Sequence, residues 1–167
     1  MDFRNIDENN FDDVLAIYKE GIETGIATFE TELPDWKKWD SSHLNYGRII
    51  VYDGSTALGW AALSPVSSRC VYGGVAEVSV YVSSRSRGKG IGSLLLNELI
   101  QISEQHDLWT LQSSIFRENE ASKYLHLKCG FREIGYKEKI GQLKGVWYDN
   151  ILLERRSKKV GSTKNRE

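Results

Sequence analysis

The chain has 167 residues, of which 40% are hydrophobic and 27% are charged, and its formal net charge is −1. This length suits one domain with a full hydrophobic core, and the near-neutral charge argues against a dedicated nucleic-acid-binding protein. No apolar run approaches the roughly 20 residues of a membrane span, and the polar, acidic first ten residues do not resemble a signal peptide, so we expect no membrane partner.

Positive charge gathers at the C-terminal end of the chain. Residues 155–167 contain six Lys or Arg and one Glu. Such a tail can contact an acidic partner, but it is more often a solvated, disordered end. We therefore expect a domain over residues 1–155 and a basic, disordered tail over residues 156–167. Cys70 and Cys129 form neither a disulfide framework nor a metal cluster, so we expect reduced thiols, a cytoplasmic protein and no metal.

The first half of the chain predicts strands that alternate with helices. Apolar residues recur at near-helical spacing from Phe11 to Ile22, after the possible caps Asp7 and Asn9, and the turn at Asp53-Gly54 separates two β-rich runs. The expected elements are a strand over 2–6, a helix over 9–25, a loop over 26–36, a weaker helix over 35–47 and two strands within 48–66.

The second half continues the alternation. A β-branched run precedes a glycine-rich loop, and the loop leads directly into a leucine-rich helix. The expected elements are a strand over 75–84, a helix that ends near 100, a strand over 108–116, a helix over 119–130 closed by Gly130, and a final pair of strands over 131–140 and 145–156. This order predicts a single α/β (α+β) domain with a central mixed, mostly antiparallel sheet flanked by helices.

The stretch SRSRGKGIGSLLLNELI, residues 84–100, has the geometry of an anion-binding cradle. Glycines let backbone N–H groups approach an anion, and a helix N-terminus adds unpaired donors and a partial positive charge. Arg85, Arg87 and Lys89 supply full charges. The alternative is a glycine-rich turn whose charges are simply solvated. The P-loop pattern is absent, and Ser93 breaks the dinucleotide fingerprint G-x-G-x-x-G.

The same loop, RGKGIG at residues 87–92, resembles the pyrophosphate-binding motif [QR]-x-x-G-x-[GA] of the GNAT N-acetyltransferase superfamily. Further stretches are similar to the phosphinothricin/methionine sulfoximine N-acetyltransferase family in the same order: ATFETE (27–32), AEVSVYV (76–82), NEASKYLHLKCGF (119–131) and GVWYDNILL (145–153). The resemblance implies a GNAT fold, acetyl-CoA as cosubstrate, a homodimer and an amino-acid-like acceptor. Val78 departs from the family pattern, since many phosphinothricin enzymes have histidine at this position. This departure argues against phosphinothricin itself as the acceptor, and less against acetyl transfer.

Acetyl transfer to an amine needs a base for the amine, donors for the carbonyl oxygen and an acid for the leaving thiolate. Glu77 is the candidate base, because it lies within an apolar strand, where a half-buried carboxylate has a raised pKa. The alternative is a glutamate on the solvent face of the strand. Strand alternation predicts that Glu77, Ser79 and Tyr81 share one face. His126 and Tyr124 are the candidate acids. The alternative for His126 is a purely structural role, and the alternative for Tyr124 is packing in the hydrophobic core.

The resemblance also implies the binding residues. The cofactor-binding set is Val80, Tyr81, Val82, Arg87, Gly88, Lys89, Gly90, Ile91, Gly92, Ser93, Asn119 and Lys128, and the substrate-binding set is Phe29, Glu30, Arg69, Glu77 and Ser79. Asn119 can equally be a plain helix cap, and Arg69 either pairs with a substrate carboxylate or is an ordinary surface arginine.

The expected reaction is direct attack, in a ternary complex, by the α-amine of a small amino-acid-like molecule on acetyl-CoA. No cysteine is paired with a base, which disfavours a covalent acetyl-enzyme. Two alternatives stay open: acetylation of a protein N-terminus or another amine, and a CoA-binding domain that has lost catalysis.

Overall fold

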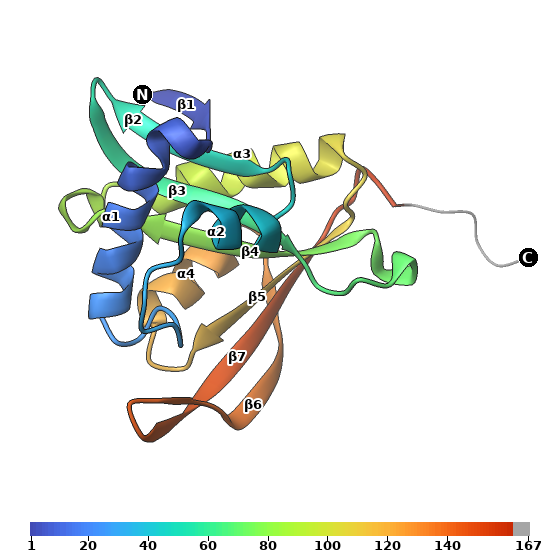
Figure 1. Ribbon diagram of the computed structural model, residues 1–167. Coiled ribbons are helices and arrows are strands. Elements are labelled where there is room, and N and C mark those ends of the chain that lie inside the picture. The colour runs from blue at the N-terminus through green and yellow to red at the C-terminus, as the bar shows by residue number, and fades with distance from the viewer. Residues whose placement is uncertain (162–167) are drawn as a thin grey trace, which may run out of the picture.

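The computed structural model describes residues 1–161 and contains a seven-stranded sheet with the strand order β1-β2-β3-β4-β5-β7-β6 (Figure 1). Every neighbouring pair is antiparallel except β4 and β5, which run parallel. The strands are β1 (Asp2–Asn5), β2 (Arg48–Asp53), β3 (Thr56–Pro65), β4 (Val75–Val82), β5 (Thr110–Phe116), β6 (Arg132–Leu143) and β7 (Val146–Arg156). The expected mixed, mostly antiparallel sheet is confirmed.

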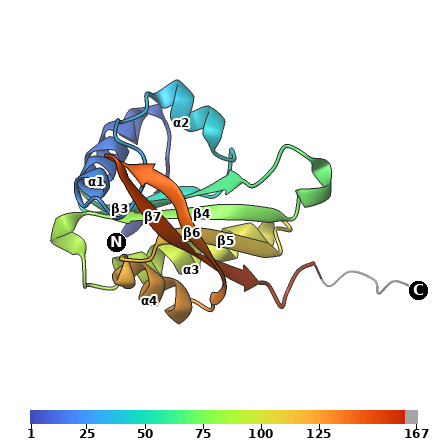
Figure 2. The same cartoon turned by 90° about the horizontal axis from the view of Figure 1, so that it is seen from below.

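Helices cover both faces of this sheet. Figure 2 shows α1 and α2 on one face and α3 and α4 on the other. The helices are α1 (Phe11–Glu23), α2 (Trp36–Ser42), α3 (Ile91–Gln105) and α4 (Glu120–Lys128), and short 3-10 turns lie at Glu8–Asn10, Cys70–Tyr72 and Ser84–Ser86. None of the helices in the described part of the chain is long and apolar enough to cross a membrane.

Local signals in the sequence account for the helix ends. Asp7 forms a capping box with Asn10 ahead of α1, and the Asp35 side chain accepts from the backbone N–H of Lys38 at 2.8 Å to cap α2. After α4, Gly130 has a φ of +89°, the left-handed conformation that commonly ends a helix.

Each face of the sheet has its own hydrophobic core. The first core packs Leu95, Leu96 and Leu99 of α3 against Val78 and other sheet residues. Each of these three leucines is fully buried, which contributes roughly 1.5–3 kcal/mol apiece to stability. The second core is aromatic and lies under α1 and α2, around Trp39 and Trp60. Val78 therefore faces α3, whereas its neighbours Glu77 and Ser79 face the opposite side of the sheet.

The sheet opens between its two parallel strands. β4 pairs with β5 only through Val75, Ala76 and Glu77, whereas β4 stays paired with β3 as far as Val82. Beyond Glu77 the β5-facing edge of β4 therefore has no strand partner among the described residues. Unpaired backbone N–H and C=O groups are available on that edge.

The end of the chain differs from the expected disordered tail. β7 continues to Arg156, Ser157 is buried, and the Ser157 hydroxyl donates to Glu104 of α3 at 2.8 Å. Gly161 packs directly against the ring of Trp109. Because of these contacts, the first residues after β7 pack against the domain. The rest of the predicted tail, residues 162–167, lies outside the described residues.

Candidate active site

A cavity of about 970 Å³ lies where β4 separates from β5. The start of α3, α4 and the loop that follows α1 complete its walls. Of the predicted site residues, those that line it are Phe29, Glu30, Glu77, Ser79, Val80, Tyr81, Val82, Arg87, Gly88, Gly90, Ile91, Gly92, Ser93, Asn119, Tyr124, His126 and Lys128. The fold thus gathers into one cavity residues that are spread over 100 positions of the sequence.

One end of this cavity is the glycine-rich loop. Gly88 and Gly90 have φ values of +73° and +81°, a conformation that other residues adopt only with strain, and a Cβ on either would meet nothing within 4 Å. Gly90 is the N-cap of α3 and provides no side-chain bond, so the first N–H groups of the helix stay unpaired. Arg87 lines the same end and donates to the Val82 carbonyl at 3.3 Å. This arrangement suits an anion.

Gly92 has a packing role. A Cβ at residue 92 would lie 3.0 Å from a methyl of Leu125, so the glycine permits the close approach of α3 and α4. This approach brings the start of α4 to the cavity, where Asn119 lies.

Asn119 is engaged at both ends of its side chain. Its Oδ1 accepts from the Ser122 N–H at 3.1 Å, which makes it the N-cap of α4. Its Nδ2 donates at 3.3 Å to the carbonyl of Ile26, in the loop that follows α1. Asn119 therefore connects α4 to the loop that carries Phe29 and Glu30.

Glu77 occupies the point at which β4 leaves β5, on the side of the sheet away from α3. The residue is exposed to the cavity, more so than the half-buried position expected from the sequence. Neighbouring protein atoms still remove enough water to raise the pKa of its carboxyl, and the positive charge of Lys137 on β6 opposes that rise. A carboxyl whose pKa is raised is a stronger base once it is ionised, which suits proton abstraction from an amine.

The two candidate acids differ in their surroundings. His126 is 3% exposed, and its Nδ1 lies 2.7 Å from the Ser122 carbonyl. Because a carbonyl only accepts hydrogen bonds, Nδ1 carries the hydrogen, and Nε2 is a buried lone pair with no partner among the described residues. Burial also lowers the pKa of His126, which favours the neutral ring. Tyr124, by contrast, is 70% exposed and lines the cavity, so it is not packed in the core.

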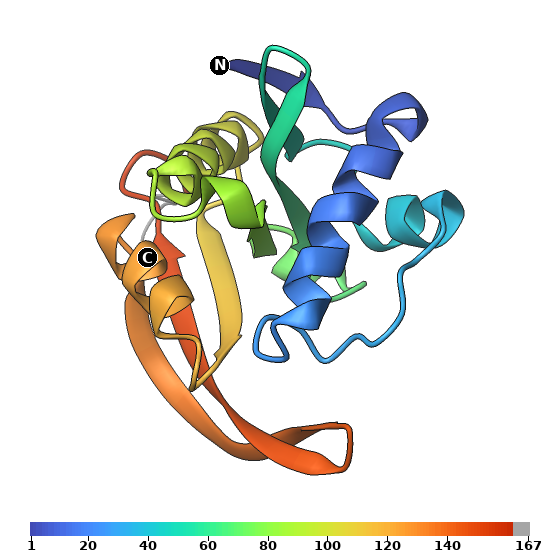
Figure 3. The ribbon, with the colours of Figure 1, turned by 90° about the vertical axis from the view of Figure 1, so that its left-hand side faces the viewer.

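The opposite end of the cavity is aromatic. The ring of Phe29 lies 4.3 Å from that of Phe116 on β5, and Phe116 stacks on Tyr148 of β7 at 5.2 Å. Figure 3 shows the β6–β7 hairpin extending beyond the helical layers. Gly141 of this hairpin contacts the Phe29 ring directly. This end therefore offers an apolar wall next to the carboxylate of Glu30.

Two predicted residues do not line the cavity. Lys89 is exposed on the glycine loop and is not among the residues that line the cavity. Arg69 is exposed in the β3–β4 connection, where its guanidinium lies 5.7 Å from the ring centre of Tyr72. The structure therefore does not bring either side chain together with the other site residues.

The sequence reasoning missed Asn150 and the two serines of β5. Asn150 is 8% exposed, lines the cavity and donates from Nδ2 to the Ser114 hydroxyl at 2.9 Å, while its Oδ1 has no partner among the described residues. An asparagine within the apolar run of β7 was the available signal. Within residues 1–161, no three His, Cys, Asp or Glu side chains gather closely enough to hold a metal ion.

Comparison with known proteins identifies the family. A model described as the Acetyltransferase (GNAT) family matches residues 12–131, which is more than half of the chain. The chain belongs to the GNAT acetyltransferase family. A curated relative, the L-methionine sulfoximine/L-methionine sulfone acetyltransferase of Pseudomonas paraeruginosa, is 30% identical over 84% of this chain and 86% of its own length.

Two solved structures resemble this GNAT enzyme over most of its length. A phosphinothricin acetyltransferase from Sinorhizobium meliloti in complex with acetyl-CoA has a TM-score of 0.87 and 27% identity, covering 99% of this chain and 93% of its own. A ribosomal-protein-alanine N-acetyltransferase from Brucella melitensis has a TM-score of 0.86 and 29% identity, covering 94% and 100%.

The residues of this GNAT acetyltransferase fit acetyl-CoA, the cosubstrate of the family. The open turn at Gly88 and Gly90 and the unpaired N–H groups at the start of α3 suit a pyrophosphate. The unpaired edge of β4 beyond Glu77 offers backbone groups to an extended, amide-containing chain.

Proposed function

We propose that this GNAT acetyltransferase transfers the acetyl group of acetyl-CoA to the α-amine of a small amino-acid-like acceptor, of the phosphinothricin and methionine sulfoximine or sulfone type. The observation that carries the proposal is the position of Glu77, a carboxylate with a raised pKa that lines the same cavity as the glycine cradle and Phe29. The names of similar enzymes support the same acceptor class.

We infer direct attack of the acceptor amine on acetyl-CoA in a ternary complex. Acetyl-CoA supplies an activated acetyl thioester. Glu77 takes a proton from the acceptor amine, and backbone N–H groups of residues 80–82 on the open edge of β4 donate to the carbonyl oxygen. Phe29, Glu30 and Ser79 hold the acceptor, and the lone pair of Asn150 Oδ1 is available to an N–H donor.

We propose Tyr124 as the group that protonates the leaving thiolate. Tyr124 lines the cavity with a hydroxyl that can donate, whereas His126 presents no hydrogen on Nε2 in its neutral state. Tyr124→Phe should lower kcat by about 10² and leave the affinity for acetyl-CoA unchanged. An unchanged kcat would remove Tyr124 from the mechanism.

The proposed function is tested by thiol release from acetyl-CoA with a panel of amines. The panel contains methionine sulfoximine, methionine sulfone, phosphinothricin, free amino acids, polyamines and short peptides. Fast turnover of the amino-acid analogues is expected. Turnover of peptides alone would instead support acetylation of a protein N-terminus, which the name of the Brucella structure makes the second candidate.

We further propose that the enzyme is a cytoplasmic homodimer. Several large apolar side chains of the β6–β7 hairpin are exposed: Ile134, Tyr136, Ile140, Val146 and Trp147. Exposed apolar patches of this kind are typical of protein interfaces. Light scattering should give twice the mass of one chain, and a single-chain mass would contradict the dimer. Free thiols at Cys70 and Cys129 are consistent with a reducing compartment.

A further inference from the structure

A second, smaller cavity of about 180 Å³ adjoins the main one. The two cavities share Tyr18, Glu30, Ser79 and Tyr81 in their linings. The other residues of the second cavity come from α2, from the residues on either side of it and from β3: Glu32, Pro34, Lys38, Trp39, Ser42, His43 and Trp60. The second cavity thus lies beside the main one, on the side of α2.

Four of the eleven residues that line this second cavity carry a Tyr or Trp ring: Tyr18, Trp39, Trp60 and Tyr81. Trp60 stacks on Tyr81 with ring centres 4.8 Å apart, and both Tyr18 and Trp39 approach Trp60 edge-on at 5.9 Å. An apolar cavity of roughly 150 Å³ is large enough to hold benzene. The second cavity therefore has room for a side chain of about that size.

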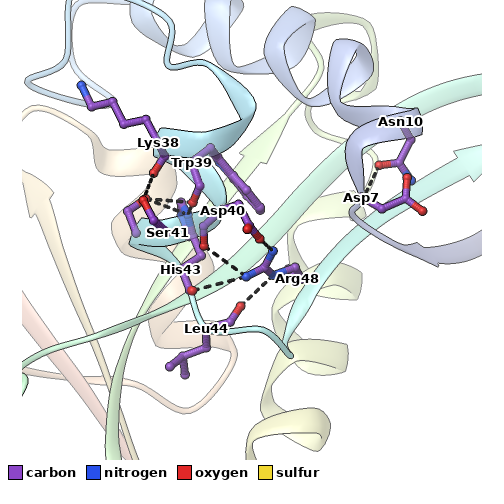
Figure 4. A network of polar contacts seen from close by, with 10 residues as sticks. Asp7, Asn10, Lys38, Trp39, Asp40, Ser41, His43, Leu44 and Arg48 are labelled. Atoms are coloured by element: carbon purple, nitrogen blue, oxygen red, sulfur yellow. Dashed lines mark hydrogen bonds and ion pairs between the residues drawn. The ribbon is translucent and has the colours of Figure 1, made fainter.

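The α2 wall is held rigidly. A helix as short as α2, with seven residues, is unstable by itself in water. Arg48 of β2 is 7% exposed, donates to the carbonyls of Leu44 at 2.7 Å and His43 at 3.3 Å, and pairs with Asp40 (Figure 4). The His43 ring also bonds to the Trp39 carbonyl at 2.6 Å. These bonds anchor the end of α2 to the sheet and fix Trp39 against the cavity.

The direction of β4 relates the second cavity to the candidate base. Glu77, Ser79 and Tyr81 alternate along one face of the strand, but only Ser79 and Tyr81 line both cavities. Two residues of a strand span about 6.6 Å. An amine at the Glu77 carboxylate therefore lies a few bonds away from the entrance to the second cavity, the distance between the α-amine of an amino acid and the end of an unbranched side chain.

The charges around the second cavity are unequal. Glu30 and Glu32 contribute two carboxylates to the lining, and Lys38 contributes one ammonium group. Burial is the largest cause of the raised pKa values of Tyr18 and Tyr81, and the negative charge of Glu30 adds a smaller rise to both. An anionic side chain would be repelled by the nearest carboxylate and would lose hydration among the rings.

From these observations we propose that the second cavity is the subsite for the acceptor's side chain and that it selects bulky, uncharged side chains over anionic ones. The proposal rests on the proposed function and narrows its substrate class. Methionine sulfone and phosphinothricin make a matched pair for it, because their side chains have the same number of heavy atoms and differ mainly by one negative charge. The sulfone is therefore the expected acceptor of the two.

The test measures kcat/KM for both acceptors with saturating acetyl-CoA, in the wild type and in two variants. Ser42→Phe places a ring at the border of the second cavity, whereas Ser41→Phe changes a neighbouring exposed serine that does not line it. The hydroxyl of each serine donates to the backbone carbonyl three residues earlier, and that of Ser42 also lies 3.1 Å from Nδ1 of His43. Ser42→Phe should lower kcat/KM for methionine sulfone about tenfold or more, and Ser41→Phe should not. Neither variant should change the affinity for acetyl-CoA.

The outcomes separate the two proposals. The side-chain subsite is overturned if Ser42→Phe and Ser41→Phe have the same kcat/KM for methionine sulfone. It is also overturned if the wild type has a higher kcat/KM for phosphinothricin than for the sulfone. In both cases the proposed acetyl transfer to amino acids stands. Absence of thiol release with every amino-acid acceptor overturns the proposed function and the subsite with it. A wild-type preference for the sulfone of about tenfold or more supports the subsite even where a variant fails to fold.

Discussion

Gly141 of β6 and the ring of Phe29 lie so close together that a Cβ on residue 141 would stand 2.4 Å from the Cζ of Phe29. Phe29 also packs on Phe116, so the ring is held between the hairpin and β5. A glycine in the hairpin thus sets the position of a side chain more than 100 residues earlier in the chain.

Gly141→Ala should displace the Phe29 ring and disturb the acceptor end of the cavity. We expect the KM for the acceptor to rise about tenfold, since small changes in an apolar pocket have effects of this size, while the KM for acetyl-CoA stays constant. Gly135→Ala is the matched control, because a Cβ there would make an ordinary contact at 3.7 Å with Leu152. A similar acceptor KM in the two variants would show that Gly141 does not position Phe29.

Glu77→Gln removes the candidate base and keeps the shape of the side chain. We expect kcat to fall by about 10² to 10⁴, the usual contribution of general base catalysis, with acetyl-CoA still bound, as measured by calorimetry. Full activity in this variant would assign the base to another group.

Lys137→Gln should change the pH dependence of catalysis. Glu77 acts as a base only when it is ionised; burial raises its pKa, and the positive charge of Lys137 lowers it. Without that charge the pKa rises further, so the acidic limb of the kcat/KM profile should move to higher pH. Lys19→Gln, an exposed substitution on α1, should leave the profile in place. A shift to lower pH in Lys137→Gln would refute the coupling.

Gly90→Ala tests the glycine cradle. The left-handed conformation at residue 90, with φ of +81°, should cost an alanine about 1 kcal/mol of stability, and the affinity for acetyl-CoA should fall. Gly54→Ala provides the comparison, since Gly54 has φ of +59° and equally open surroundings but lies in the turn between β2 and β3. Chemical denaturation should show similar losses for the two variants, and a similar loss of acetyl-CoA affinity in both would contradict the cradle.

Glu104→Gln tests the anchoring of the segment after β7. Burial tends to raise the pKa of Glu104, but bonds from Ser157, Arg155 and Lys159 outweigh this effect and lower it. A carboxylate with a lowered pKa stabilises the fold above its unfolded pKa and loses that contribution as the pH falls through its folded pKa. We therefore expect a loss of about 2 kcal/mol at neutral pH that shrinks below about pH 4. A constant difference across this range would mean that the charge of Glu104 is unimportant.

Features that depend on neighbouring residues could be predicted from the amino-acid sequence. The glycine cradle could be predicted because its glycines and the helix start are contiguous, and a positive φ favours glycine at residues 88 and 90. The shared face of Glu77, Ser79 and Tyr81 could be predicted because side chains alternate along any strand.

The contacts between distant segments of the chain could not be predicted in this way. The register of β6 is irregular between Lys137 and Gly141, and Gly141 lies against Phe29. A period-two pattern cannot specify such a bulge. The separation of β4 from β5 opens the main cavity. The hydrogen bonds of Arg48 hold α2 in place beside the second cavity. Arg69 has the right chemistry for the site but lies outside the cavity lining, because its position depends on long-range packing, which short sequence patterns do not encode.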